Sequence, residues 1–90
     1  MSHLTSNADL VARVRRIAGQ VTAIEKALDA DAPCAIVLHR IAAVRGAVNG
    51  LLDEVIADHL KAHVAAPGLS DAERAEGTAD LLAVIRRYSK

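Results

Sequence analysis

Two histidines four positions apart stand in the stretch DHLKAHV, residues 58–64, and the chain has a single cysteine, Cys34, far upstream. Side chains at positions i and i+4 share one face of a helix, so the imidazoles of His59 and His63 could bind one metal ion together. Taken alone, such a pair is more often solvated helix surface, by about two to one. The zinc-peptidase motif HExxH is excluded, because Leu60 stands where that motif needs a glutamate. Whether the pair is a metal site therefore depends on Cys34.

Cys34 faces the same way as both histidines if one helix carries all three. At about 100° per residue, His59 and His63 fall within roughly 20° of the direction of Cys34, one on each side. The 25 positions between Cys34 and His59 amount to about 37 Å of helix, so the three side chains cannot meet within one chain. They can meet between two antiparallel copies related by a two-fold axis within the small-residue stretch GAVNG, 46–50. The alternative is that Cys34 is a small buried residue at a helix start.

Further nitrogen donors stand at the N-terminus. His3 and the α-amine could join a metal site, whereas a free tail explains the position of His3 equally well. The small side chain of Ser2 favours removal of Met1, which would place the amine one residue nearer to His3. The remaining histidine, His39, lies roughly 140° from Cys34 in helical projection and is predicted to lie on the surface.

Three helices are predicted to position these residues, at about 9–28, 33–63 and 71–88, after a flexible tail over 1–8. No strand pattern appears, so the predicted class is all-α. In the first helix, apolar residues recur at alternating steps of four and three, which is typical of a helix that packs along another helix. These residues are Leu10, Val14, Ile17, Val21, Ile24 and Leu28.

Local signals mark the ends of these helices. Asp31 is placed to cap the second helix and Pro33 to lie in its first turn, while Ser70 and Glu73 form a capping-box pattern ahead of the third. No further proline follows before His63, so the second helix is about 45 Å long, more than the first helix can cover. The second helix therefore needs partners from another chain, and we expect an oligomer.

Composition narrows the class of protein. The 90 residues suffice for one small domain, and a single cysteine excludes an internal disulfide and fits a reducing cytoplasm. No apolar run approaches the roughly 18 residues of a membrane span, and no signal-peptide pattern begins the chain. Lysine plus arginine and aspartate plus glutamate number 11 each, and Phe and Trp are absent. Any nucleic-acid contact would therefore run through phosphates and arginines.

Three segments carry a resemblance to a known family: RVRRIAGQV (13–21), AIVLHRIAAVRGAVNGLLDEVI (35–56) and DHLKAH (58–63), with Cys34 between the first two. The chain resembles the CsoR/RcnR/FrmR family of bacterial repressors, which sense copper, nickel or cobalt, or formaldehyde. The resemblance implies a three-helix protomer with a long central helix, an antiparallel homodimer with sites shared between subunits, and a homotetramer made of two dimers. It also implies that the protein binds operator double-stranded DNA, and that an inducer weakens this binding.

The ligand residues distinguish the subfamilies. Copper sensors of the family have a second cysteine where this chain has His63, and formaldehyde sensors usually have no histidine there and a proline where this chain has Ser2. Nickel and cobalt sensors have the N-terminal amine with histidine and cysteine residues that match His3, Cys34, His59 and His63. The resemblance therefore implies a Ni(II)- or Co(II)-responsive repressor of efflux genes, not an enzyme, with Cys34 from one subunit and His59 and His63 from another. Zn(II) or Cu(I) could bind the same residues in vitro.

For DNA binding, the resemblance points to Arg13 and Arg16 on the first helix and Arg45 on the second, although such residues also serve simply to keep a helix soluble. Two other functions stay open. One is a formaldehyde-responsive repressor that uses Cys34 and the N-terminal amine, and the other is a helical metal-buffering protein that does not bind DNA. All three readings place the protein in the cytoplasm, with no membrane partner.

Overall fold

The computed structural model of the chain describes residues 7–88, and every regular element in that range is helical. The elements are α1 (Asn7–Asp29), α2 (Cys34–Leu60), the π-helical turn η1 (Lys61–Ala65) and α3 (Asp71–Tyr88). The all-α class with three main helices and a long central one, predicted from the sequence, is confirmed.

Some helix bounds differ from the predicted ones. The first helix begins at Asn7, so two residues assigned to the tail are helical, and Asp9 lies in the first turn, where its charge favours the helix N-terminus. The α-helical part of the second helix ends at Leu60 rather than at His63, and the π-helical turn η1 continues it. The rest of the predicted tail lies outside the described residues.

The corner between α1 and α2 depends on Asp31. This residue has a φ of 53°, in the left-handed region, and its backbone N–H donates to the carbonyl oxygen of Leu28 at 3.1 Å. Asp31 therefore ends α1, where a left-handed residue is common, instead of capping α2 as predicted. Pro33 lies directly before α2, and its carbonyl oxygen accepts hydrogen bonds from the N–H groups of Ile36 and Val37, at 2.9 and 3.3 Å.

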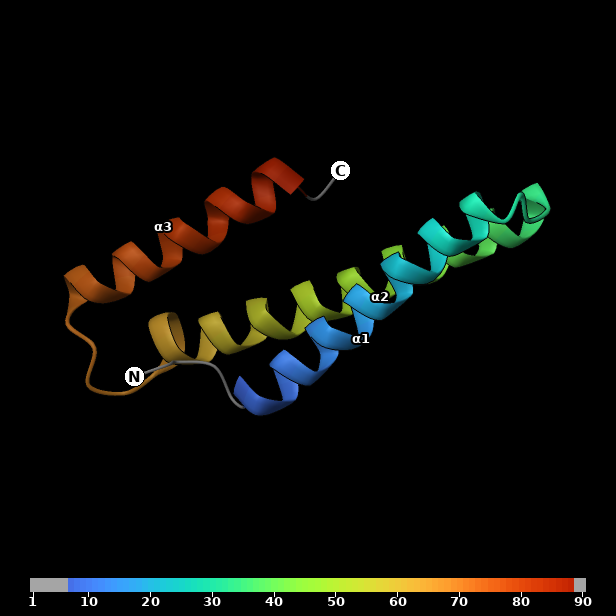
Figure 1. The fold of residues 1–90 in the computed structure, drawn as a ribbon. Coiled ribbons are helices and arrows are strands. Elements are labelled where there is room, and N and C mark those ends of the chain that lie inside the picture. Colours follow the sequence, from blue (N-terminus) through green and yellow to red (C-terminus); the bar gives the residue numbers. More distant parts are fainter. Residues whose placement is uncertain (1–6, 89–90) are drawn as a thin grey trace. The chain divides into compact units, whose positions relative to one another are not determined.

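The described residues divide into two compact units, one ending at Leu52 and the other beginning at Asp53. In the first, α1 and the first part of α2 run side by side in opposite directions, joined by the short corner (Figure 1). Gly50 on α2 leaves room for the side chain of Arg13, since an added Cβ would lie 3.0 Å from the Nη2 atom of that arginine. Leu10 is buried, but Val14 and Val21 of the same predicted stripe are each half exposed. The stripe on α1 is therefore only partly covered within one chain.

The second unit contains the end of α2, η1 and α3, and α3 packs against η1. The Arg74 side chain on α3 donates to the carbonyl oxygens of Val64 and Ala66 at the end of η1. The predicted capping box at the start of α3 is confirmed. The Ser70 N–H donates to the Glu73 carboxylate at 2.9 Å, and the Glu73 N–H donates to the Ser70 hydroxyl oxygen at 3.1 Å.

One expectation about membranes needs correction. The continuous helical segment Cys34–Ala65 has 32 residues and a mean hydropathy of 1.3 in its most apolar window, so by length and composition it could cross a membrane. This is weak evidence, because a helix that packs in the core of a soluble protein passes the same test. The apolar surface of this segment must nevertheless be covered by something.

Removing the cap of α3 should destabilise the protein. We expect Ser70→Ala to lower the free energy of unfolding by about 1 kcal/mol, because the Glu73 N–H loses its hydrogen-bond acceptor. Thr22→Ala is the matched control: the Thr22 hydroxyl donates to the Ala18 carbonyl oxygen within α1, where alanine is the better helix former. Urea unfolding at one fixed chain concentration measures both variants. Equal losses in the two variants would contradict the assignment.

The capping box should also make stability depend on pH. Hydrogen bonds from the Ser70 backbone, and then from its side chain, hold the pKa of Glu73 below its ordinary value. The ionised carboxylate therefore contributes stability above the ordinary Glu pKa, and this contribution is lost as pH falls through the lowered pKa of the folded state. We expect an NMR titration of the Glu73 carboxyl carbon to show the lowered pKa. Glu73→Gln, which can still accept the Ser70 hydrogen bond, should lose this part of the acid dependence.

Candidate metal centre

The imidazoles of His59 and His63 lie beside each other at the end of the second helix. Their ring centroids are 4.9 Å apart, and the ring planes are tilted by 44°. His59 belongs to the last turn of α2 and His63 to η1, and both side chains are half-buried. Two imidazoles that share one face, as here, can offer nitrogen ligands to the same metal ion.

The turn that carries His63 is π-helical, from Lys61 to Ala65. Such turns are rare, close their hydrogen bonds from i to i+5, and occur frequently at functional sites. Nothing in the letters KAHVA marks this turn, since alanine, lysine and valine all fit an ordinary α-helix. The spacing of the two histidines therefore predicted a common face but not the local form of the backbone.

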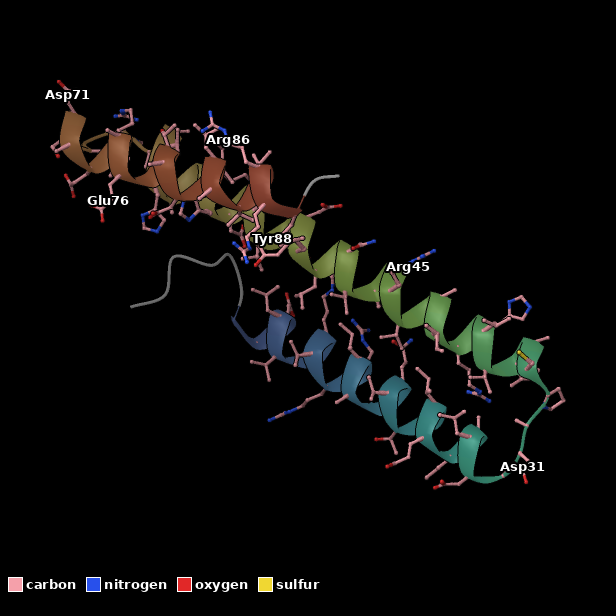
Figure 2. All side chains as sticks on the ribbon, turned by 90° about the horizontal axis from the view of Figure 1, so that it is seen from above. Asp31, Arg45, Asp71, Glu76, Arg86 and Tyr88 are labelled. Carbon is pink, nitrogen blue, oxygen red and sulfur yellow. The ribbon has the colours of Figure 1, made fainter. Side chains whose placement is uncertain are left out.

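An open hollow beside the two histidines is lined on the α3 side mainly by acidic residues. They are Glu73, Glu76 and Asp80, and Glu76 projects from α3 in Figure 2. Carboxylates around a hollow raise the local concentration of cations. Among residues 7–88, however, no three His, Cys, Asp or Glu side chains form a group that could hold a metal ion. The described part of one chain thus supplies two imidazoles, and further donors must come from elsewhere.

Cys34 is the first residue of α2, with an exposed, free thiol. It belongs to the compact unit that ends at Leu52, whereas both histidines belong to the other unit. That a second copy brings its Cys34 to the histidines stays a prediction. His3 and the α-amine lie outside the described residues, and His39 is exposed, as predicted.

The face of α2 that carries Cys34 is apolar and uncovered over the first compact unit. Ala43 and Gly50 lie toward α1, and at about 100° per residue the opposite face of α2 carries large apolar side chains. These side chains are 41–61% exposed: Leu38, Ile41, Val48 and Leu52. This is the face on which the sequence predicts contact with a second copy.

The three arginines predicted to bind DNA do not form one patch within the chain. The Arg13 guanidinium lies over Gly50, between α1 and α2, and Arg16 is exposed on α1. Arg45 is exposed on α2 and points away from α1 (Figure 2), where it borders an apolar hollow with Leu38 and Ile41. Arg45 could join the arginines of α1 only through a second copy, so a common DNA-binding face stays a prediction.

Two residues near the histidines escaped the sequence analysis. Asp58 is 4% exposed, which is unusual for a carboxylate, and no pattern around it signals burial. Gly77, in the middle of α3, is buried, and its carbonyl oxygen lies 2.9 Å from the Nε2 atom of His59. A glycine inside a helical pattern frequently has a packing reason, and this was the available signal.

Similarity to known proteins extends over nearly the whole chain. A model of the family described as metal-sensitive transcriptional repressors matches residues 6–87. The chain is 46% identical to the transcriptional repressor RcnR of Salmonella arizonae and 45% identical to RcnR of Escherichia coli K12, in alignments that cover 100% of both partners. Among solved structures, it resembles the formaldehyde-responsive regulator FrmR of Salmonella enterica serovar Typhimurium, in a variant with a glutamate replaced by histidine. The TM-score is 0.84 at 42% identity, over 93% of this chain and 98% of FrmR.

Proposed function

The chain belongs to the family of metal-sensitive transcriptional repressors, and within this family we propose that it is released from operator DNA by Ni(II) or Co(II). Membership makes it a transcriptional regulator rather than an enzyme. The metal is decided by the donors, and the observation that carries our proposal is the pair of imidazoles, His59 and His63, with centroids 4.9 Å apart.

The donor set fits these two ions. Imidazole nitrogens suit Ni(II), Co(II) and Zn(II), and a thiolate adds affinity for each of them. With the imidazoles of His59 and His63, the thiolate of Cys34, and the imidazole and amine of the His3 tail, nitrogen donors outnumber sulfur. Such a nitrogen-rich set favours six-coordinate Ni(II) or Co(II), whereas Cu(I) prefers sites with more thiolates. Full-length similarity to proteins named RcnR supports the same subfamily.

The site is completed between two copies in this proposal. The apolar face of α2, which begins at Cys34, is the surface on which a second, antiparallel helix would pack. Burying one large apolar side chain contributes about 1.5–3 kcal/mol, so four such residues on each copy provide a strong drive to associate. Packing about an axis near Ala47 would bring Cys34 of one copy to His59 and His63 of the other. Two such dimers would form the tetramer.

DNA binding and inducer binding compete through this assembly. Arg13 and Arg16, repeated in every copy, contact operator phosphates, so zero net charge is no obstacle. When the histidines and Cys34 hold the inducer, the subunits shift to an arrangement that fits DNA less well, with a coupling of about 1–3 kcal/mol. Efflux genes are then derepressed in the cytoplasm. Thiolate and neutral imidazole are needed for this binding, so induction weakens as pH falls.

A second candidate function is a response to formaldehyde. It is favoured by the structural similarity to a formaldehyde-responsive regulator and by the exposed thiol of Cys34. The Cys34 sulfur and the N-terminal nitrogen would each lose one hydrogen and become joined by the formaldehyde carbon, whose oxygen leaves as water. This chemistry has no use for His63, so replacing His63 separates the two candidates.

A Co(II) titration tests the proposed site. We expect reduced protein, titrated anaerobically, to show a thiolate-to-cobalt absorption band with weak visible transitions. Cys34→Ala should abolish the band, and His63→Ala should weaken Co(II) binding at least tenfold. His39→Ala is the matched control and should behave as wild type, because His39 is exposed and lies on a different face of α2 from Cys34. Absence of any Co(II) spectrum would favour the formaldehyde candidate, and intense tetrahedral transitions would favour a zinc- or copper-type site.

Operator binding tests the repressor assignment against a metal buffer. We expect Arg16→Ala to weaken binding to DNA from the upstream region of the regulated gene, and to reduce the salt dependence by about one ion per lost contact. Lys26→Ala, at an exposed position later on α1, should leave both unchanged. Added Ni(II) should weaken wild-type binding by about 5–150-fold, which corresponds to the coupling above. Fluorescence anisotropy measures all three, and identical affinities for metal-free and Ni(II)-loaded protein would refute the mechanism.

A further inference from the structure

Helix α3 meets both histidines at one residue, Gly77. The Nε2 atom of His59 lies 2.9 Å from the Gly77 carbonyl oxygen, within hydrogen-bond distance. The backbone of Gly77 also lies against His63: a Cβ added at Gly77 would come within 2.8 Å of the His63 carbonyl carbon and Cβ, and closer still to its carbonyl oxygen. Real Cβ atoms essentially never approach other atoms so closely, so any larger residue here would force α3 away from the histidines.

The hydrogen bond to Gly77 determines which nitrogen of His59 carries a proton. A backbone carbonyl oxygen can only accept, so Nε2 must be the protonated nitrogen. A neutral imidazole has one N–H, and Nδ1 is then the nitrogen with the lone pair in the ring plane. A histidine that binds a metal through one ring nitrogen typically donates the other N–H to a carbonyl or carboxylate, and this fixes both tautomer and ring direction.

We propose that Gly77 is a positioning residue of the inducer site: its carbonyl oxygen holds His59 in the Nε2-protonated form, so that Nδ1 is the nitrogen offered to the metal. The missing side chain of Gly77 lets α3 approach closely enough to do so. This inference rests on the proposed function for the identity of the ligand, but the tautomer of His59 does not depend on it.

Local helix stability does not explain a glycine at this position. Glycine destabilises the interior of a helix relative to alanine, because it loses more backbone freedom on folding. At Gly19, where nothing lies within 4 Å of an added Cβ, alanine would simply be the better helix former. At Gly77, by contrast, the space for that Cβ is filled by the backbone and Cβ of His63. The glycine is therefore required by the contact between α3 and the histidines.

The test compares Gly77→Ala with Gly19→Ala as the matched control. Long-range proton–nitrogen NMR spectra of the metal-free proteins, at mildly alkaline pH where imidazole is neutral, report the tautomer of His59, assigned with a His59→Gln variant. Competition with a chelator gives the Co(II) dissociation constant. We expect wild type and Gly19→Ala to show protonated Nε2 and equal affinities. Gly77→Ala should lose the tautomer preference and bind Co(II) about 10–100-fold more weakly.

The outcomes separate this inference from the proposed function. Wild-type protein that binds Co(II) but carries its His59 proton on Nδ1 would overturn the role of Gly77 alone, and this result needs no variant to fold. Gly77→Ala with wild-type Co(II) affinity would overturn it too. Wild-type protein with protonated Nε2 and no Co(II) affinity would instead refute the proposed function, and with it any role of Gly77 toward a metal.

Discussion

The close approach of α3 to the histidine-bearing turn is the contact on which the candidate site depends. Gly77 presents its backbone to both histidines, and Arg74, one turn earlier on α3, donates to the carbonyl oxygens of Val64 and Ala66. Carbonyl groups at a helix end lack helical donors, so this arginine also satisfies groups that would otherwise need water. The rings are therefore held largely by the backbone of a neighbouring helix. A backbone group has few ways to move aside, which makes it a firm reference for ring orientation.

The first compact unit, by contrast, is incomplete as a single chain. Large apolar side chains on both α1 and α2 are about half exposed there, including Val14, Val21 and Leu38. Contiguous apolar surface of this kind marks an interaction site in soluble proteins. In our proposal, covering the α2 face and completing the inducer site are one event, because Cys34 begins that same face. This would explain why a chain of 90 residues with a small core is adequate.

Family membership and donor chemistry answer different questions about this protein. The family establishes a transcriptional repressor, and similarity over the full length leaves no part of the chain for another activity to explain. The inducer depends on a few atoms instead. The exposed thiol of Cys34 serves metal and aldehyde chemistry alike, whereas a second imidazole at His63, beside that of His59, is useful only for a metal.

The sequence by itself determined the helices, the capping box of Ser70 and Glu73, and the common face of the two histidines, because these depend on contacts within about one turn of helix. The tertiary structure alone decided the π-helical turn, the close contact at Gly77 and the direction of Arg45 relative to α1. Gly77 lies 18 residues from His59, and no local periodicity relates two such positions. Contacts of that kind arise from how helices pack, which depends on side-chain volumes and backbone approach rather than on residue spacing.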